Sequence, residues 1–356
     1  MSDEMWIQSH AGPYSVAFHE DFPLDLFDGL ENEPHFLVDA NVARLYNSPL
    51  KPVLDHCNTI VIDATEENKS LQRTVPIFER LVENNVRRDH TLVAIGGGVV
   101  QDITCFISST LLRGVAWRFV PTTLLAQADS CIGSKSSINL GKTKNILGTF
   151  NPPKTISIYS AFLDSLDSKD IRSGVGEIIK VHAISGVAAF DELAADFDRL
   201  IDDRSILQKY IRSALRIKQR YIEEDEYDRG IRNIFNYGHS FGHAIESATN
   251  YVVPHGIAVT MGMQIANFVA LRRGLLPTEH YERMRPILRA NYGFYAEEAI
   301  PIDALLTALL KDKKNTSTAL RLVFPVGNKA LIQTVSVLPD SELRGQCIDA
   351  LRELSA

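Results

Sequence analysis

Cysteine is scarce in this 356-residue sequence, and the four that occur are far apart. They are Cys57, Cys105, Cys131 and Cys347. No two of them form a Cys-x-x-Cys pair, so the sequence offers neither a disulfide framework nor a thiolate zinc site. This usage is typical of a protein in a reducing compartment.

An excess of positive charge and a long apolar segment are also absent. With 37 basic and 44 acidic residues, the formal net charge is -7, so we expect no nucleic-acid partner. The most apolar segment, Ile257 to Leu271, is interrupted by Gln264 and Asn267, which predicts a buried helix rather than a membrane span. The N-terminal residues MSDEMWIQ are acidic where a secretory leader would be basic. We therefore expect a cytoplasmic protein with no membrane partner.

The length and the pattern of the chain predict two domains, since a chain of 356 residues is longer than a domain with a single hydrophobic core usually is. Short β-branched runs alternate with amphipathic stretches in the first part, which is typical of a parallel sheet covered by helices. From residue 168 the apolar residues recur at helical spacing. We expect an α/β domain over residues 1–165 and an α-helical domain over residues 166–356. The expected strands lie in the runs HFLVDA, TIVIDA, TLVAIGGG, WRFVPTT and KTISIY.

A glycine-rich turn, AIGGGVVQD, follows one expected strand and opens a helix. Residues 96–98 would let backbone amides approach a pyrophosphate at the helix N-terminus. The turn is not a G-x-G-x-x-G motif, and a simple strand-to-helix connection explains the glycines as well. Polar residues after other strands favour a nucleotide site, because strand ends surround the ligand in such sheets. These residues are Asp39, Asn41, Glu66 and Lys69.

A cationic segment, residues 120–148, carries Lys135, Lys142 and Lys144 among small residues. A solvated loop would explain lysines alone. Polar residues among them favour a surface that binds a polar, anionic ligand. These are Thr122, Thr123, Asp129 and Asn145.

The strongest local signal is a histidine cluster in NIFNYGHSFGHAIESATNYVVPHG. His239 and His243 are four residues apart on one helix face, the spacing of two imidazoles that share a metal or a substrate. A lone histidine is usually structural, but His255 is a third in a short window. Glu177 and Lys180 share a helix face upstream, and a carboxylate with two imidazoles is an ordinary divalent-metal set. The residues alone leave open which two histidines would ligate.

At this point the chain resembles the 3-dehydroquinate synthase family of sugar phosphate cyclases, over residues 39–315. The motifs, in order, are EENK, GGGVVQD, RGVAWRFVPTTLLAQADSCIGSK, KNILG, GEIIK, RNIFNYGHSFGHAIE, PHG and DKKN. The resemblance implies a Rossmann-like N-terminal nucleotide-binding domain and an all-α C-terminal metal-binding domain. It implies NAD and a divalent ion, zinc or else cobalt, in the cleft between them, and a homodimer.

The resemblance also implies roles for individual residues. The metal ligands would be Glu177, His239 and His255, which leaves His243 for the substrate. The cofactor residues would be Asp39, Asn41, Glu66, Lys69, Gly97, Gly98, Val99, Asp102, Thr122, Thr123, Lys144 and Phe162. The catalytic residues would be Asp129, Lys135, Lys180, Lys218, Arg232, Asn236 and His243. The substrate phosphate would meet Asn145, Lys313 or Lys314, and Arg113 from across the dimer interface.

The implied reaction is a lyase reaction in which NAD oxidises a ring carbon, phosphate is eliminated, the hydride returns and an aldol step closes a carbocycle. In the family, the arginine that Arg232 matches faces a substrate carboxylate. With Lys218 and Asn236, it favours 3-deoxy-D-arabino-heptulosonate 7-phosphate, with 3-dehydroquinate as the product. Sedoheptulose 7-phosphate and glucose 6-phosphate have no carboxylate.

The chain departs from the family pattern at Gln101, Ser134, Val181-His182 and Ile257. A glutamate commonly stands where Ile257 does, so a possible acceptor for the metal ligands is lost there. The departures keep open a diverged cyclase acting on another sugar phosphate, such as an amino-heptulosonate phosphate or sedoheptulose 7-phosphate. A metal-dependent polyol or alcohol dehydrogenase and a non-catalytic relative are further alternatives. The many cations argue against the dehydrogenase, and the complete metal set argues against the non-catalytic relative.

Overall fold

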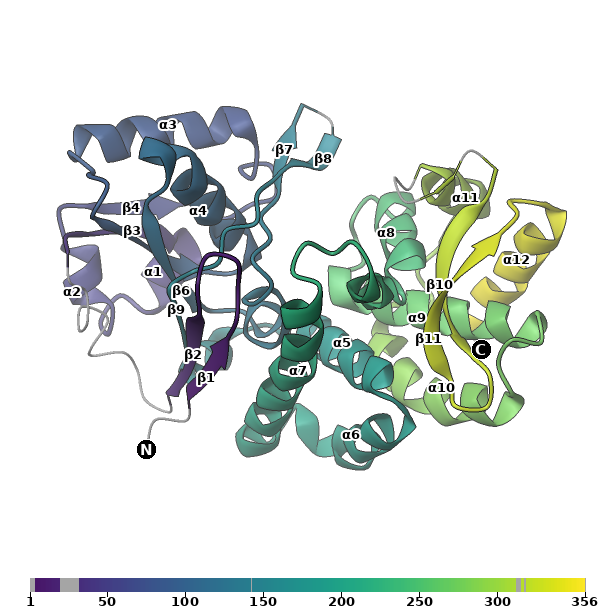
Figure 1. The fold of residues 1–356 in the computed structure, drawn as a ribbon. Coiled ribbons are helices and arrows are strands. Elements are labelled where there is room, and N and C mark those ends of the chain that lie inside the picture. The colour runs from purple at the N-terminus through teal and green to yellow at the C-terminus, as the bar shows by residue number, and fades with distance from the viewer. Residues whose placement is uncertain (1–3, 20–31, 142, 312–314, 317, 356) are drawn as a thin grey trace. The chain divides into compact units, whose positions relative to one another are not determined.

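The computed structural model describes residues 4–19, 32–141, 143–311, 315–316 and 318–355. The chain divides into two compact units, drawn in Figure 1. The first comprises Met1–Leu166 and Gln219–Tyr227, and the second comprises Asp167–Lys218 and Asp228–Ala356. The sequence predicts one boundary near residue 165, whereas the structure also groups the short segment Gln219–Tyr227 with the first unit. No helix among the described residues is long and apolar enough to cross a membrane.

The first unit is built on a seven-stranded sheet of order β1-β2-β9-β6-β5-β3-β4. Its strands are β1 (Glu4–Ile7), β2 (Tyr14–His19), β3 (Pro34–Asp39), β4 (Thr59–Ile62), β5 (Thr91–Gly96), β6 (Ala116–Pro121) and β9 (Thr155–Tyr159). In this order, every pair of neighbouring strands from β2 through to β4 is parallel, and only β1 and β2 pair in antiparallel fashion. The predicted parallel sheet is thus confirmed, and its five expected strands are β3, β4, β5, β6 and β9. The β1–β2 hairpin was not expected.

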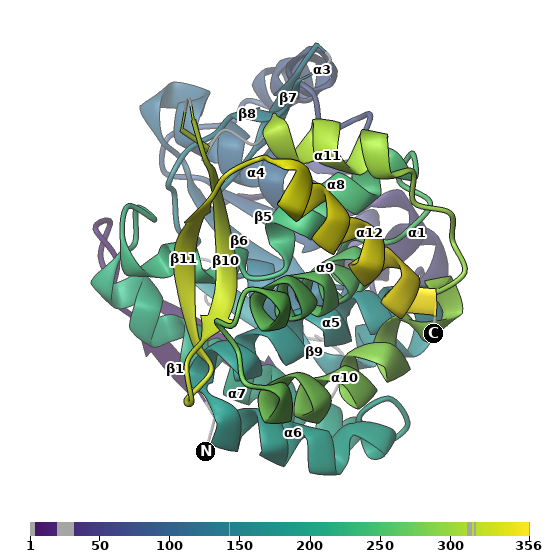
Figure 2. The ribbon, with the colours of Figure 1, turned by 90° about the vertical axis from the view of Figure 1, so that its right-hand side faces the viewer.

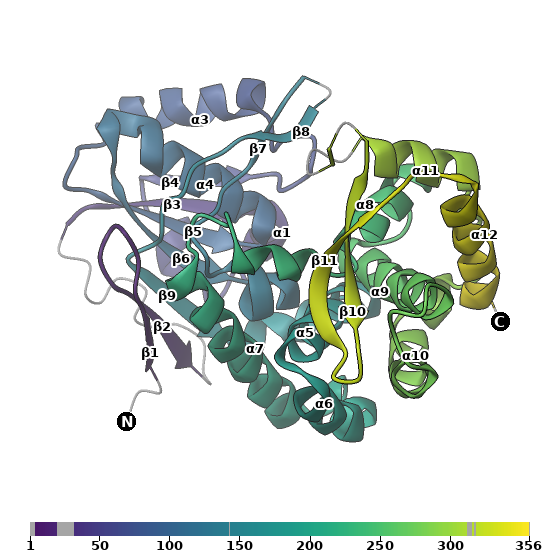
Figure 3. The same cartoon turned by 45° about the vertical axis from the view of Figure 1, so that its right-hand side comes forward.

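Helices accompany this sheet, as the α/β pattern predicts. They are α1 (Ala40–Leu45), α2 (Lys51–Leu54), α3 (Leu71–Glu83) and α4 (Gly98–Thr110), with the short turns η1 (Leu111–Arg113), η2 (Ala126–Ser130) and η3 (Ser160–Ser165). Buried strand residues such as Phe36, Val38, Val93 and Ile95 form part of the core. A small hairpin of β7 (Ile138–Leu140) and β8 (Thr143–Leu147) contacts α3 and α4 through β7 (Figure 3).

The strand order reverses between β3 and β5. From β3 the chain continues to β4 at one edge, whereas β5, β6 and β9 follow on the other side of β3. Ligands of open parallel sheets bind at the carboxyl ends of the strands beside such a reversal, where the loops turn away from each other. Asp39 ends β3 and Gly96 ends β5, so the predicted nucleotide residues lie at this position.

The second unit is helical, as predicted. It contains α5 (Ser168–Ser185), α6 (Val187–Leu200), α7 (Arg204–Glu224), η4 (Ile231–Asn236), α8 (His239–Ala248), α9 (His255–Arg272), α10 (Thr278–Tyr292), η5 (Gly293–Tyr295), α11 (Ile302–Leu310) and α12 (Ser341–Ser355), although the last turns of α7 group with the first unit. Helix α9 packs against α5, α8, α10 and α12 in the middle of this unit (Figure 2). Its residues 256–267 are all buried, which confirms the predicted buried helix.

One element adds to the expected helical fold. β10 (Leu320–Val326) and β11 (Leu331–Val337) form an antiparallel hairpin, and β10 contacts α9 (Figure 2). The sequence signal is a β-branched run on each side of Gly327, whose φ of 73° favours glycine in the turn. The hairpin packs on α9 and lies between α11 and α12 in the chain. The second unit is therefore mainly, but not entirely, helical.

Candidate active site

Three side chains from separate helices converge in the second unit. Glu177 comes from α5, and His239 and His255 are the first residues of α8 and α9. The Oε1 atom of Glu177 lies 3.6 Å from Nε2 of His239 and 3.5 Å from Nε2 of His255. His243, one turn further along α8, has a ring nitrogen within 4.8 Å of a nitrogen on each of the other two rings.

Backbone constraints bring these helices together. Gly238 precedes α8 with φ of 77°, and a Cβ there would lie 2.6 Å from the carbonyl oxygen of Val259. A Cβ on Gly256 would lie 1.8 Å from the carbonyl oxygen of Ser173 on α5. Glycine at these positions therefore permits α8 and α5 to approach α9 closely, which places Glu177 beside the two histidines.

The geometry of this cluster fits a divalent metal ion. Ligand bonds of about 2.1 Å in a tetrahedral zinc site place neighbouring ligand atoms about 3.4 Å apart. The two carboxylate-to-imidazole distances, 3.6 and 3.5 Å, are close to that value. Oε1 of Glu177 is buried and has no hydrogen bond from any described residue, which is costly unless another partner satisfies it. Glu177, His239 and His255 therefore lie close enough together to hold one ion, and their assignment as its ligands stays a prediction.

Lys180 and the imidazoles set the charge state of the cluster. Lys180 donates to Oε2 of Glu177, and both side chains are buried. Burial opposes ionisation of Glu177, but Lys180 and the histidines outweigh it and hold the pKa of this carboxyl well below its usual range. Burial and Lys180 together keep the pKa of His239 well below its ordinary value. His239 is therefore neutral near pH 7, which is the form that binds a metal.

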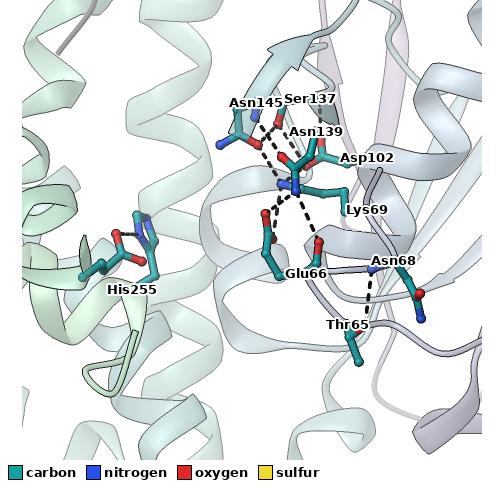
Figure 4. A network of polar contacts seen from close by, with 10 residues as sticks. Thr65, Glu66, Asn68, Lys69, Asp102, Ser137, Asn139, Asn145 and His255 are labelled. Carbon is teal, nitrogen blue, oxygen red and sulfur yellow. Dashed lines mark hydrogen bonds and ion pairs between the residues drawn. The ribbon is translucent and has the colours of Figure 1, made fainter. Parts of the chain in front are cut away.

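The pKa of His255 is shifted in the opposite direction, upwards. Burial alone would lower its pKa, but contacts with Glu177 and Glu246 raise the pKa of His255 to about 10. The Nδ1 atom of His255 lies 3.1 Å from Oε2 of Glu246 on α8, a contact drawn in Figure 4. Sequence reasoning missed Glu246, although it follows His243 by one helical turn in the run HAIE.

The second unit also contains buried basic side chains. Lys180, Lys218 and Arg232 are 2%, 7% and 5% exposed. Arg232 and Asn236 belong to η4, and the ring centre of Phe235 in this turn lies 5.7 Å from Nζ of Lys180. Because burial lowers the local dielectric constant, such groups attract an anion more strongly than surface lysines do. They are a physical basis for the predicted anionic substrate.

A polar network surrounds Lys69 in the first unit (Figure 4). Nζ of Lys69 donates to Oδ2 of Asp102 at 3.1 Å and to Oδ1 of Asn145 at 2.9 Å. It also lies 3.6 Å from Oε2 of Glu66. Burial raises the pKa of Asp102, and Lys69 opposes that rise. The structure thus brings together three predicted cofactor residues and Asn145, which was expected at the substrate phosphate.

Two residues of this network were not predicted. Nδ2 of Asn139 donates to Oε1 of Glu66 at 2.9 Å, and Oδ1 of Asn139 accepts from the backbone amide of Asn145 at 2.8 Å. The Ser137 amide donates to Oδ1 of Asp102 at 2.9 Å, and its hydroxyl lies within hydrogen-bond distance of Oδ2 of Asp102 and Oδ1 of Asn145. Both lie in or next to β7, and they connect the β7–β8 hairpin to Glu66 and to Asp102 on α4.

The glycine turn has the geometry of an anion-binding loop. Gly97 precedes α4 without a side-chain cap, which leaves first-turn amides such as those of Gly98 and Val99 for another acceptor. A Cβ on Gly97 would lie 2.9 Å from Cγ2 of Thr123, so glycine lets the ends of β5 and β6 approach. A Cβ on Gly98 would meet nothing within 4 Å. There is therefore open space beside these amides, which fits a dinucleotide phosphate.

The other predicted cofactor residues have varied surroundings. Asp39 caps α1 by accepting from the Asn41 amide at 2.8 Å, and burial raises the pKa of its carboxyl. The Thr122 amide donates to the carbonyl oxygen of Gly96 at 3.0 Å. Phe162 is 1% exposed and packs in the core, and its carbonyl oxygen accepts from the Tyr46 hydroxyl at 3.1 Å.

The other predicted catalytic, cofactor and phosphate-binding side chains do not belong to the histidine cluster or to the Lys69 network. Asp129 lies in η2, whereas Lys135 and Lys144 are exposed. Arg113 is exposed beyond the far end of α4, about 20 Å from the glycine turn for a helix of this length. Leu112 and Arg113 have φ of 52° and 67°, a strained backbone that is common at functional turns. Lys313 and Lys314 lie outside the described residues.

The departures from the family pattern have defined contacts. Gln101 donates to the Ser130 carbonyl at 2.6 Å and accepts from its hydroxyl at 2.7 Å. Ser134, at φ of 65°, donates to Oε1 of Glu226 at 2.6 Å. His182 lies 2.9 Å from the Ser213 hydroxyl, and Ile257 is fully buried. Each departure is therefore integrated into the packing of its own unit.

Family models match most of the chain. The N-terminal model of 3-dehydroquinate synthase matches residues 59–173, and the C-terminal model matches residues 174–315. A 3-dehydroquinate synthase from Thermoanaerobacter sp. (strain X514) is 33% identical over 338 residues, which cover 91% of this chain and 95% of that protein.

Two solved structures resemble the whole chain. A 2-epi-5-epi-valiolone synthase from Streptomyces hygroscopicus subsp. jinggangensis, with NAD+ and Zn2+ bound, has a TM-score of 0.84 and 26% identity, with 96% of each chain covered. A 2-deoxy-scyllo-inosose synthase in complex with carbaglucose-6-phosphate, NAD+ and Co2+ has a TM-score of 0.81 and 22% identity, with 98% of this chain and 99% of that chain covered. The second likeness, at this identity, shows the fold alone.

Proposed function

The chain belongs to the 3-dehydroquinate synthase family, and we propose that this sugar phosphate cyclase converts 3-deoxy-D-arabino-heptulosonate 7-phosphate to 3-dehydroquinate and phosphate. The observation that carries the proposal is the convergence of Glu177, His239 and His255 at distances suited to a divalent ion. Lys180, in contact with Glu177, adds a buried positive charge beside that position.

NAD and a divalent ion would supply the central chemistry. When bound, they would provide reversible hydride transfer and polarisation of a substrate oxygen, which makes the neighbouring C–H acidic enough for phosphate to leave. Glu177, His239 and His255 would hold the ion. The amides of Gly98 and Val99 would receive the cofactor diphosphate, and the network of Lys69 would hold the strand-end residues around the nucleotide.

The buried cations of the second unit would bind the anionic substrate. Lys180, Lys218 and Arg232 can stabilise the negative charge that grows as phosphate departs, because they are already desolvated. A guanidinium pairs with a carboxylate through two parallel hydrogen bonds. Arg232 therefore favours the heptulosonate, which has a carboxylate, over sedoheptulose 7-phosphate and glucose 6-phosphate.

Several finer assignments belong to the same proposal. Zinc is the proposed ion, since one carboxylate and two imidazoles form a ligand set it uses. We assign the enzyme to the carbon-oxygen lyases of the shikimate pathway, active as a cytoplasmic homodimer. Arg113 cannot reach the glycine turn of its own chain along α4, which supports a role across a dimer interface.

A panel of sugar phosphates tests the substrate. Purified protein with NAD and zinc should release inorganic phosphate from the heptulosonate phosphate, with dehydroquinate as the organic product and no net NADH. We expect no release from sedoheptulose 7-phosphate or glucose 6-phosphate. Release from either of these alone would assign the chain to another cyclase reaction, and steady NADH accumulation with a polyol would indicate a dehydrogenase.

The Arg232→Ala variant tests whether the substrate has a carboxylate. Loss of a buried guanidinium that binds a carboxylate should raise KM and lower kcat for the heptulosonate phosphate. If the physiological substrate lacked a carboxylate, the variant would lose little activity on it. A variant as active as the wild type on the heptulosonate phosphate would contradict the role of Arg232.

A further inference from the structure

We propose that Glu246 is the positioning residue for His255, an inference that rests on the proposed metal site. Oε2 of Glu246 on α8 lies 3.1 Å from Nδ1 of His255 at the start of α9. Nε2 of the same ring lies 3.5 Å from Oε1 of Glu177. The imidazole is therefore held between two carboxylates, one at the metal position and one behind it.

The contact determines which ring nitrogen faces the metal position. A carboxylate is an acceptor only, so Nδ1 of His255 must carry the proton that Glu246 accepts. The other nitrogen, Nε2, is then the one that offers its lone pair beside Glu177 when a cation is bound. Histidine ligands of metals usually donate their second N–H to a carboxylate or a carbonyl, which fixes the ring and makes it more basic.

His255 has more need of such support than His239 has. Its side chain is 34% exposed, against 15% for His239 and 1% for Glu177. Nδ1 of His239 lies 3.4 Å from the carbonyl oxygen of Tyr237, two residues before it, so that ring is held by its own backbone. His255 follows Pro254 at the start of α9, and Nδ1 of its ring contacts the side chain of Glu246.

The contact also joins two helices of the site. Glu246 lies on α8, its side chain is 15% exposed, and it contacts the first residue of α9. Its carboxylate therefore ties the start of α9 to α8.

Metal binding by four proteins tests this role. Metal-free wild type, Glu246→Ala, Glu246→Gln and the control Glu297→Gln are titrated with zinc against a chromophoric chelator. Their cobalt-substituted forms are compared by visible absorption. Glu297 is an exposed glutamate of the same unit. We expect about a 10- to 100-fold loss of zinc affinity in Glu246→Ala, a smaller loss in Glu246→Gln, and none in Glu297→Gln.

The outcomes separate the inference from the function on which it rests. If the wild type binds zinc tightly and both Glu246 variants keep its affinity and its cobalt spectrum, Glu246 has no positioning role. If the wild type itself binds no zinc, the metal site fails. Glu246→Gln preserves the size of the side chain and an amide oxygen, so it decides the matter should Glu246→Ala fail to fold.

Discussion

At the scale of single residues, histidines of this chain differ in protonation because of the groups that face them. Glu177 and Glu246 raise the pKa of His255 to about 10 although the side chain is partly buried. Burial first, and then His90, lower the pKa of His35 to about 4. His35 is fully buried on β3, and its Nε2 lies 2.9 Å from Nδ1 of His90. A histidine in the sequence therefore has no fixed charge until its neighbours are known.

We predict that His35 contributes to the acid sensitivity of the fold. Because its folded pKa of about 4 is below the ordinary 6.5, its contribution is complete above pH 6.5 and is lost as the pH falls towards 4. The full shift corresponds to about 3 kcal/mol of unfolding free energy, most of which is lost between pH 7 and pH 4.5. Urea denaturation of wild type, His35→Leu and His35→Gln at pH 7 and pH 4.5 measures it. Both variants should lose less stability between these values, and wild-type slopes in both would refute the assignment.

At the scale of elements, the site depends on how closely α5 and α9 approach. The amide of Gly256 donates to Oγ of Ser173 at 2.9 Å. A Cβ on Gly176 would lie 2.1 Å from the carbonyl oxygen of Gly256, so a glycine on each helix makes the contact possible. Glu177 and His255 are the next residues to these glycines in the chain. The spacing of the two helices thus sets the distance between two proposed metal ligands.

The substitution Gly256→Ala should therefore damage both stability and metal binding. The added methyl group would lie 1.8 Å from a backbone oxygen of α5, which a side-chain rotation cannot relieve. Overpacking of this kind costs about 1–3 kcal/mol or more, and it should move His255 away from Glu177. Urea denaturation and zinc titration are the measurements.

Gly345→Ala is the matched control, because Gly345 lies on α12 with nothing within 4 Å of its added Cβ. It should leave zinc affinity unchanged and stabilise the protein by up to about 1 kcal/mol. Equal behaviour of the two variants would show that the α5–α9 contact is not tight in solution.

At the scale of the whole molecule, each compact unit contains its own group of ligand-binding residues. The proposed metal ligands all belong to the second unit, and the glycine turn with the network of Lys69 belongs to the first. A metal that bridges α5, α8 and α9 binds only the folded second unit. Its binding free energy therefore adds to the stability of that unit.

We predict that removing the metal lowers the thermal stability of the protein. At a free zinc concentration 100 times Kd, the stabilisation is about 2.7 kcal/mol. Thermal unfolding with a chelator and with added zinc should show this difference in the wild type. In His255→Ala, which lacks one ligand, zinc should have little effect, and stabilisation of this variant equal to that of the wild type would point to another ligand set.

The sequence by itself determined the elements and the family. Apolar periods and β-branched runs are local properties, so the parallel strands β3, β4, β5, β6 and β9 and the buried helix α9 could be predicted. The motif spacing was enough to identify the family and to name Glu177, His239 and His255 as proposed ligands. Their roles remain predictions, although their side chains do converge.

Only the tertiary structure decided which distant residues meet. Glu246 reaches Nδ1 of His255 because α8 packs on α9, and Asn139 reaches Glu66 because β7 packs against α3 and α4. The grouping of Gln219–Tyr227 with the first unit has the same character. A hydrogen bond tolerates a change of only a few tenths of an ångström in the distance between donor and acceptor. No local sequence pattern encodes that distance for segments far apart in the chain.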